Sequence, residues 1–372
     1  MDFDFTRRQK LIQALIGEFL EKECPSDKVR ELEESEKGYD PGLWRKIAEL
    51  GYLGIAFPKE YNGGGCGFVE LMIIAEEMGK AAFPSPFLST IIQCGLIILE
   101  GGAEEQKRDL LGRVIRGDLI LSLAQYEQDG SYPLSFTNVR AEPEGDQLVL
   151  NGTKMFVKDA NIANKLIVVV KGPQVGISLC LVDTGDPGIA ISKMPTIGMD
   201  NTCEVIFEDV RISKENIIGP VGKGGELLTK TSIKATIAKC AEMVGSCKAC
   251  IDMTAAYAKK REQYGRPIGG FQIIQHYMAD MLLAYDISYN YLYKVGWMVD
   301  QGMDCTTEAS VLKSYINKNY KFIAEKAVQI HGAMGTTREG NVGLYYRRAK
   351  SSEYEMGDTN FHYENIADAL LR

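Results

Sequence analysis

Carboxylates and a pair of cysteines are the residues of this chain whose types and spacing could support chemistry. A carboxylate in a dry pocket can remove a proton from carbon, because burial raises its pKa toward the working pH. The chain has 50 Asp and Glu residues from which such a base could come. Cys247 and Cys250 form a C-x-x-C, a spacing found in redox and metal sites. These two cysteines lie among small residues in a helical pattern, without a second pair nearby, so a packing role is favoured.

Length and composition indicate a globular protein. A chain of 372 residues can bury a substantial core and divides into two or three domains. The net charge of -8 argues against nucleic-acid binding, and no run of apolar residues is long enough to span a bilayer. The acidic N-terminus lacks the pattern of a secretory signal, and nine dispersed cysteines suit a reducing compartment. We therefore expect a soluble, cytoplasmic protein.

The elements that must position the candidate residues follow the order helical, β-rich, helical. Residues 1–118 repeat apolar side chains at helical spacing, and the apolar run Ile91–Leu99 predicts a buried helix. Residues 119–222 contain short β-rich runs, which indicate an antiparallel barrel or sandwich. Turn signals separate these runs, among them Glu144-Gly145-Asp146 and Asn151-Gly152. Residues 223–372 carry three long helical stretches, so the predicted class is α+β with three domains at these boundaries.

Four motifs, in this order along the chain, resemble those of the acyl-CoA dehydrogenase family. They are Trp44–Gly65, Asn151–Phe156, Arg261–Ile268 followed by Phe271-Gln272, and Gln329–Gly335. The resemblance covers nearly the whole chain. It implies a β domain between two helical domains, the second a four-helix bundle, and a homotetramer, dimer or heterotetramer that binds one FAD per subunit. It also implies that the enzyme oxidises an acyl-CoA thioester and passes electrons to an electron-transferring flavoprotein.

The resemblance also assigns cofactor and substrate contacts. The residues implied to contact FAD are Gln125, Tyr126, Phe156, Arg261, Gln263, Tyr264, Phe271, Gln272, Gln329, Gly332, Ala333 and Asp358. Those implied to contact substrate are Ser131, Met356 and Gly357. Arg261 would reach the pyrophosphate of the neighbouring subunit's FAD; an ion pair with Glu262 or another surface carboxylate is the alternative. Gly332 would let the backbone approach the cofactor, or would simply cap a helix. Lys158 replaces the Thr usual beside flavin N5.

The catalytic base of the family is missing from both of its usual positions. Alignment without gaps places Met356 at the usual C-terminal Glu, and Ala235 at the position that a second group of the family uses. Glu242 lies two helical turns after Ala235 on the same face, while Glu355 and Asp358 flank Met356, so these three carboxylates are the candidates for the base. An ion pair for Glu242 and a turn cap for Asp358 are the favoured alternatives.

The missing base is also compatible with a different reaction or with no reaction. The backbone N–H of Met356 can still polarise the thioester, as in the family, so Met356 itself counts among the catalytic candidates. The proton could leave a different carbon, as in relatives that act on ring acyl thioesters. The chain could instead be a catalytically silent, flavin-binding subunit of a heteromeric enzyme, or an acyl-CoA oxidase. His362 is interpreted as a packing or hydrogen-bonding residue rather than an acid or base.

Overall fold

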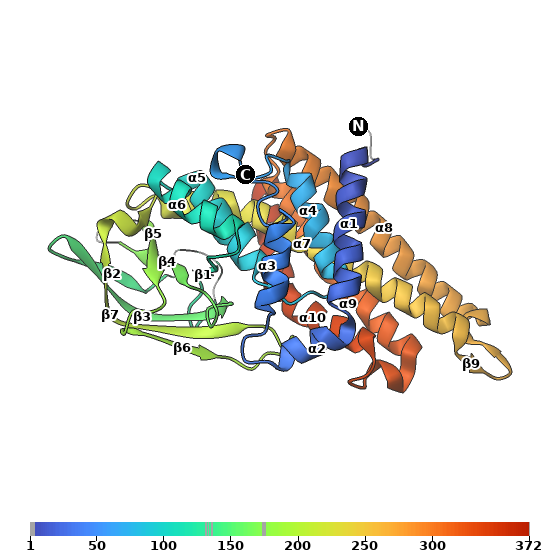
Figure 1. The fold of residues 1–372 in the computed structure, drawn as a ribbon. Coiled ribbons are helices and arrows are strands. Elements are labelled where there is room, and N and C mark those ends of the chain that lie inside the picture. The colour runs from blue at the N-terminus through green and yellow to red at the C-terminus, as the bar shows by residue number, and fades with distance from the viewer. Residues whose placement is uncertain (1–3, 131, 133, 135–136, 173–175, 372) are drawn as a thin grey trace. The chain divides into compact units, whose positions relative to one another are not determined.

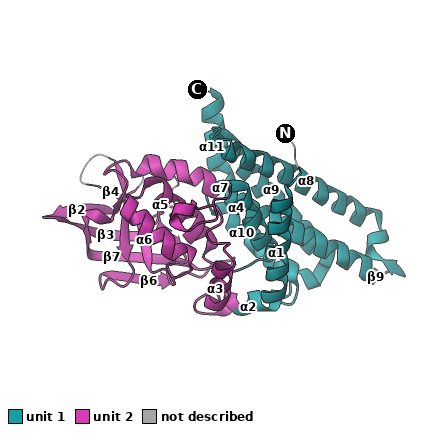
Figure 2. Ribbon diagram, turned by 45° about the horizontal axis from the view of Figure 1, so that its top comes forward, with its two compact units in different colours: residues 1–31, 67–83, 236–372 teal, residues 32–66, 84–235 magenta. Residues whose placement is uncertain are grey.

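The computed structural model describes residues 4–130, 132, 134, 137–172 and 176–371 (Figure 1). These residues form two compact units, each assembled from separate stretches of the chain (Figure 2). The first unit comprises Met1–Glu31, Gly67–Phe83 and Thr236–Arg372, and the second comprises Leu32–Cys66 and Pro84–Ala235. The α+β class is confirmed, whereas the three domain boundaries drawn from the sequence stay predictions.

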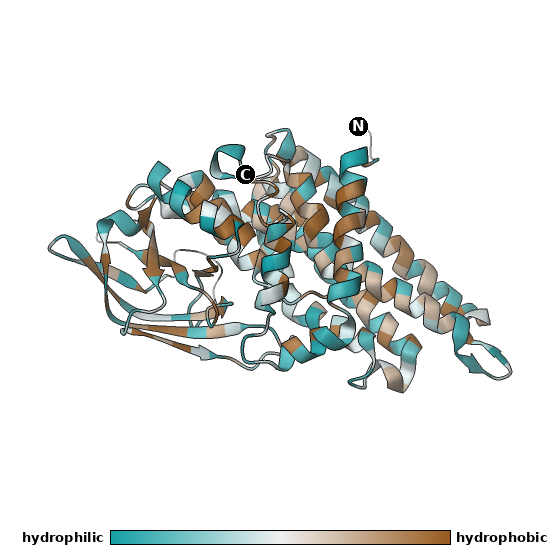
Figure 3. Cartoon of the chain, viewed as in Figure 1, coloured by the Kyte–Doolittle hydropathy of each residue, from teal (hydrophilic) through white to brown (hydrophobic). Residues whose placement is uncertain are grey.

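Long helices make up the first unit. Its helices are α1 (Arg7–Glu23), α4 (Phe68–Lys80), α7 (Gly224–Lys260, from Thr236 onward), α8 (Gln272–Asp300), α9 (Thr306–His331), α10 (Asn341–Tyr354) and α11 (Thr359–Leu371), and it includes the start of α2 (Ser26–Glu34). A short hairpin of β9 (Glu262–Gln263) and β10 (Arg266–Pro267) joins α7 to α8 and is hydrophilic (Figure 3). The three long C-terminal helices expected from the sequence are confirmed.

Two glycines allow α4 and α7 to pack with their backbones in direct contact. A Cβ added at Gly245 would lie 1.8 Å from the carbonyl oxygen of Glu76, and one at Gly79 would lie 1.9 Å from that of Glu242. The Ser246 hydroxyl lies between the helices and donates to the Gly79 carbonyl oxygen at 3.0 Å. Only a residue without a side chain fits this approach, because the obstructing atoms belong to the backbone.

The second unit combines short helices with one sheet of eight strands. Its helices are α3 (Pro41–Glu49), η1 (Lys59–Tyr61), η2 (Phe87–Gly95), α5 (Leu96–Gly101) and α6 (Glu104–Ile115), with η4 (Lys214–Asn216) before the last strand. Its strands are β1 (Leu121–Ala124), β2 (Arg140–Glu144), β3 (Gln147–Lys158), β4 (Lys165–Lys171), β5 (Ile177–Asp183), β6 (Ile189–Lys193), β7 (Thr202–Ser213) and β8 (Ile217–Ile218). The strand order is β6-β7-β3-β2-β4-β5-β8, and β1 pairs with β4.

The sheet differs from the sequence expectation in two details. Most neighbours are antiparallel as expected, but β1 and β2 each pair with β4 in parallel. Asn151-Gly152 was expected to be a turn, and this expectation is wrong, because both residues lie inside β3. The register of β3 against β7 shifts between Leu150 and Gly152, and the Asn151 side chain accepts a hydrogen bond from the backbone N–H of Asp209. The glycine therefore marks a β-bulge, whose irregular backbone it accommodates with φ of 135°.

The apolar segment Ile91–Leu99 is helical and buried, as expected, but in two forms. Residues of η2 adopt a π-helix, and the chain continues as the α-helix α5. The buried side chains of the segment Ile91–Leu99 belong to the core of the second unit. In the part of the chain that the structure describes, no helix combines the length and the apolar character needed to cross a bilayer.

Candidate active site

A tight turn between α10 and α11 holds Met356, the residue at the usual position of the base. Met356 has φ of 61° and Gly357 has φ of 99°, so the chain reverses through two residues with left-handed backbone. The Asp358 carboxylate accepts a hydrogen bond from the backbone N–H of Phe361 at 2.8 Å. Asp358 therefore caps the N-terminus of α11, which is the alternative role considered for it from the sequence.

Lys313, on α9, stabilises this turn by hydrogen bonds from the interior of the unit. Its side chain is fully buried, and its ammonium group donates to the carbonyl oxygens of Ser352, Glu353 and Gly357 at 3.0, 3.2 and 3.2 Å. It also donates to the side-chain oxygen of Asn317 at 2.6 Å. Burial lowers the pKa of Lys313 to about 8. The ammonium thus satisfies carbonyl groups at the end of α10 that have no partner within the helix.

His362, on α11, holds the turn from a second direction. Its Nε2 donates to the carbonyl oxygen of Met356 at 2.9 Å, and its Nδ1 accepts from the Ser310 hydroxyl across 3.2 Å. Burial lowers the pKa of His362 to about 4, so the ring is neutral near pH 7. Its role is hydrogen bonding, as interpreted from the sequence. Because C=O and N–H point in opposite directions in a trans peptide, this bond directs the Gly357 N–H away from His362.

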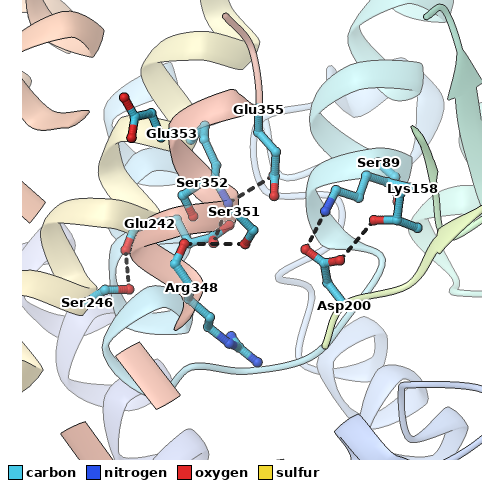
Figure 4. Close-up of polar contacts among 12 residues, drawn as sticks. Ser89, Lys158, Asp200, Glu242, Ser246, Arg348, Ser351, Ser352, Glu353 and Glu355 are labelled. Carbon is cyan, nitrogen blue, oxygen red and sulfur yellow. Dashed lines mark hydrogen bonds and ion pairs between the residues drawn. The ribbon is translucent and has the colours of Figure 1, made fainter. Parts of the chain in front are cut away.

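Glu242 and Glu355, drawn in Figure 4, share one lysine partner. The ammonium of Lys239 lies 2.8 Å from a carboxylate oxygen of Glu242 and 3.0 Å from one of Glu355. The Lys239 side chain is 4% exposed, that of Glu355 15% and that of Glu242 29%. The tertiary fold therefore brings together two of the carboxylates proposed from the sequence. Glu242 also makes the ion pair that was its alternative role.

Phe156, at the end of β3, has both an unusual backbone and an exposed ring. Its φ is 57° and its side chain is 43% exposed, so it is not a core residue. A non-glycine residue with such a backbone is uncommon and is concentrated at functional sites. The neighbouring Met155 N–H donates to the carbonyl oxygen of Tyr126 at 2.9 Å, which ties β3 to the chain after β1.

A buried ion pair holds the segment that carries Gln125 and Tyr126. The fully buried Lys154 donates to the Gln125 carbonyl oxygen at 3.0 Å and to the Glu127 carboxylate at 2.8 Å. Glu127 in turn accepts from the backbone N–H of Val139 at 3.0 Å. Both ends of the loop between β1 and β2 are thereby fixed. Ser131, proposed as a substrate contact, lies outside the described residues.

Lys158 forms an ion pair with Asp200, next to a second carboxylate, that of Asp159. Its ammonium lies 2.5 Å from Asp200, and the pair is shown in Figure 4. Burial acts to raise the pKa of Asp200, but the Lys158 charge outweighs it and the pKa is held well below its usual range. The adjacent Asp159 is partly buried and accepts a hydrogen bond from the Ser89 hydroxyl at 2.6 Å; desolvation of its carboxylate raises the pKa of Asp159 to about 6. Asp159, like Phe156, has a positive φ, of 59°.

The remaining cofactor candidates lie on exposed surface of the first unit. Arg261, Gln263 and Tyr264 are exposed around the β9–β10 hairpin, Tyr264 to 93%. Arg261 has no ion pair with any residue that the structure describes, so the alternative partner Glu262 is not bound to it. The guanidinium of Arg266 stacks over the Phe271 ring at 4.2 Å, which orders the hairpin against α8. Gln272, which begins α8, is also exposed.

The turn after α9 is exposed as well. Gln329, Gly332 and Ala333 face solvent, and Gly332 ends α9 with φ of 60°. Its helix-capping role is therefore observed. A Cβ at Gly332 would meet no atom of the described residues within 4 Å, so the backbone here is open to an approaching group.

Lys239 and Lys313 were missed in the sequence because each is a single charge within a helical pattern, and Lys154 was noted only as part of the Asn151–Phe156 motif, without a role of its own. Lys239 had one available signal, since Glu242 follows it by three residues, a spacing that pairs side chains on a helix. Lys313 and Lys154 have distant partners that only the fold reveals. Cys247 and Cys250 are buried in α7, and burial raises the pKa of both thiols, in agreement with packing roles.

Comparison with known proteins extends over the whole chain. The N-terminal, middle and C-terminal domain models of acyl-CoA dehydrogenase match residues 6–118, 124–210 and 222–371. Acryloyl-CoA reductase (NADH) of Anaerotignum propionicum is 30% identical over 100% of this chain and 96% of its own. Subunit CarC of the caffeyl-CoA reductase-Etf complex of Acetobacterium woodii is 30% identical over 99% of each chain. The fold matches butyryl-CoA dehydrogenase from Megasphaera elsdenii with a TM-score of 0.93 and 27% identity over 100% of both chains.

Proposed function

The chain belongs to the acyl-CoA dehydrogenase family, and on this premise we propose that it oxidises an acyl-CoA thioester with bound FAD and uses Glu355 as proton acceptor. The observation that supports Glu355 is its place in the fold. Its largely buried carboxylate precedes Met356 directly, in a turn whose carbonyl groups are fastened by Lys313 and His362. A carboxylate is thus held one residue away from the family's usual position.

The chain's residues fit a bound flavin. The exposed ring of Phe156 offers an apolar face for a flat ring system, and Arg261 offers a guanidinium without an ion pair in the described part of the chain. The open backbone at Gly332 leaves room for the adenosine end. A bound flavin would supply the hydride acceptor, and the hydride would come from the β-carbon of the acyl chain, the neighbour of the carbon that loses the proton.

The protein's own contribution is to polarise the thioester and to take up a proton. The backbone N–H of Met356 is the proposed donor to the thioester oxygen, where negative charge develops as the adjacent carbon loses its proton. Glu355 is the proposed recipient of that proton, and its partial burial limits competition from water. Met356 and Gly357 would contact the thioester through their backbone.

The other two carboxylates fit this role less well. The Asp358 carboxylate is engaged at the N-terminus of α11. Glu242 is the more exposed of the two carboxylates that bind Lys239, and it belongs to α7 rather than to the turn that carries Met356. We therefore assign Asp358 a structural role at the turn and Glu242 a supporting one.

Electron transfer and assembly are further proposals. The Acetobacterium woodii relative is a subunit of a reductase-Etf complex, and this supports an electron-transferring flavoprotein as the electron acceptor here. A homotetramer, with the β9–β10 hairpin reaching a neighbouring subunit, is proposed from the exposure of Arg261, Gln263 and Tyr264. A cytoplasmic location is proposed from the composition.

A silent subunit is the second candidate, because neither Met356 nor Ala235 can accept a proton. Anaerobic titration with straight, branched, dicarboxylic and cyclic acyl-CoA thioesters tests the choice. A dehydrogenase bleaches the flavin absorbance with at least one of them and reoxidises slowly in air. Bleaching followed by rapid reoxidation with peroxide formation identifies an oxidase. A yellow protein that no thioester bleaches is a binding subunit, and a protein that cannot take up FAD contradicts all three.

A further inference from the structure

We infer that Lys239 is a positioning residue that holds Glu355 in place for proton transfer, while Glu242 serves as the counter-ion that Lys239 keeps throughout the reaction. This inference rests on the proposed function. It assigns separate roles to three side chains that the fold brings together, of which only the two carboxylates were singled out in the sequence.

The geometry supports a shared and directed interaction. Lys239 and Glu242 lie on α7, one helical turn apart, whereas Glu355 follows the end of α10. The Lys239 ammonium is almost fully buried and reaches both carboxylates within 3.0 Å. Glu355 belongs to the turn rather than to a helix, so its orientation depends on side-chain contacts, and Lys239 supplies one from a rigid element. An ammonium with several donors can hold two carboxylates at once.

The charge balance explains why two carboxylates are needed. Before the reaction, one positive charge faces two negative charges. When Glu355 takes the proton from the carbon next to the thioester, it becomes a neutral acid, and the negative charge now lies on the thioester oxygen. Glu242 remains ionised, so the buried ammonium retains a partner. Without Glu242, the same step would leave Lys239 facing a neutral acid, which is unfavourable for a buried charge.

Other charged groups of the same unit act on this cluster. The charges of Lys239, Glu353 and Glu355 act on the pKa of the buried Lys313, which lies on α9. His362, on α11, is neutral near pH 7, and its carboxylate neighbour is Asp358. Because the two lysines have the same sign, removal of Lys239 also changes the field at Lys313. The pH dependence of proton exchange is therefore compared among variants of Lys239, Glu242 and Glu355, because a single variant does not separate their effects.

Exchange of the protons next to the thioester isolates the step in question, because it needs proton transfer but no net oxidation. The FAD-loaded protein is incubated in D2O with butyryl-CoA, glutaryl-CoA or cyclohexanecarbonyl-CoA, and exchange is followed by NMR over a range of pH. Glu355→Gln should slow exchange by about 100-fold or more. Glu242→Gln should keep an exchange rate within about tenfold of the wild-type rate. The pH at which this rate rises should move to a lower value, because the Lys239 charge then acts on Glu355 alone.

Lys239→Met should move the rising limb of exchange to higher pH by about one unit or more, because an ammonium favours the ionised form of a nearby carboxylate. Lys239→Arg should restore most of the wild-type profile. Lys248→Met is the matched control, since Lys248 forms an exposed ion pair with Asp252 on the same helix, and it should leave the profile unchanged. If Lys239→Met fails to fold, the opposite shift expected for Glu242→Gln still tests the assignment.

Failure of this inference differs from failure of the proposed function. If wild-type protein bleaches with a thioester but Lys239→Met has an unchanged profile, Lys239 does not act on the proton acceptor. If Glu355→Gln retains exchange and Glu242→Gln loses it, the two roles are reversed and the inference is wrong. If wild-type protein neither exchanges protons nor bleaches with any thioester, the proposed function itself is wrong.

Discussion

Neighbouring residues of the turn before α11 have different roles. In the proposed function Met356 contributes its backbone N–H and Glu355 its carboxylate, whereas the Asp358 carboxylate accepts a hydrogen bond from the Phe361 N–H at the start of α11. These roles follow from the partners of each side chain, which differ although the residues are neighbours in sequence.

Asp358→Ala should lower the free energy of unfolding by about 1 kcal/mol, because α11 loses a capping carboxylate. Proton exchange with acyl-CoA should continue, since Asp358 is not the proposed acceptor. Asp358→Asn, which can still cap a helix, is the control and should recover most of the stability. A normal melting temperature combined with lost exchange would instead make Asp358 the acceptor.

Arg261→Ala should weaken FAD binding by roughly 10- to 100-fold, as expected for the loss of a charge-assisted hydrogen bond. The measurement is flavin absorbance per protein after gel filtration. The exposed Arg108, on α6, offers a control, and Arg108→Ala should keep its flavin. Equal flavin content in both variants would reject a pyrophosphate contact by Arg261.

At the scale of elements, the close packing of α4 against α7 positions the helix that carries Lys239 and Glu242. The glycines at this crossing leave no space for a side chain, and Ser246 bridges the two backbones. The same α4 carries Glu76, which is buried and accepts a hydrogen bond from the Tyr293 hydroxyl of α8. The α4–α7 crossing therefore places the backbones of the two helices in contact beside the buried Glu76 carboxyl group.

Gly245→Ala should destabilise the protein by about 3 kcal/mol or more, because its Cβ would overlap the backbone oxygen of Glu76 and the helices must separate. Gly112→Ala, on α6, is the matched control. A Cβ there meets only the end of the flexible Arg116 side chain at 3.6 Å, so stability should be unchanged or slightly higher. Equal melting temperatures for both variants would show that α4 and α7 are not in backbone contact.

Glu76 makes stability depend on pH. Burial raises its pKa from 4.5 to about 7, against the opposing hydrogen bond from Tyr293. The folded protein therefore holds a proton that the unfolded chain releases between these values, and stability falls as pH rises through this window. Glu76→Gln should remove this loss, which amounts to up to about 3 kcal/mol above pH 7. Asp159 and His362 also titrate near this window, so the quantity to measure is the difference between wild-type and variant melting temperatures. A difference that does not change with pH would contradict the prediction.

At the scale of the whole molecule, one face of α8 exposes apolar side chains. Ile273, Leu283 and Ile287 recur at helical spacing and are 54%, 61% and 45% exposed. Exposed apolar side chains on one side of a helix are typical of a face that packs against another surface. Together with the exposed β9–β10 hairpin, it supports the proposed assembly of several copies of the chain.

Leu283→Glu should shift the protein to a smaller species in light scattering, since it places a charge in the proposed interface. Flavin content should fall with it, because the Arg261 hairpin is proposed to reach the neighbouring subunit. Leu370→Glu changes an equally apolar residue near the C-terminus, where the side chain is 76% exposed, and serves as the control. An unchanged mass and flavin content in Leu283→Glu would reject α8 as the interface.

Local sequence patterns determined the elements of this protein. Apolar spacing predicted the long helices and most strands, because periodicity reflects which face of an element is buried. Motif order predicted the family, and the counted positions of Met356 and Ala235 predicted the absence of the usual base. Asn151-Gly152 was wrongly predicted as a turn because the same residue pair suits a turn and a bulge, and only pairing with β7 distinguishes the two.

Only the tertiary structure decided the partners of the charged side chains. Lys239 meets Glu355, and Lys313 meets the end of α10, across separations in the chain that carry no periodic signal. The physical reason is that an ion pair depends on distance in space and on burial, neither of which is encoded by spacing along the chain. The identity of the elements is thus a local property, whereas the arrangement of charges around Met356 is a product of the fold.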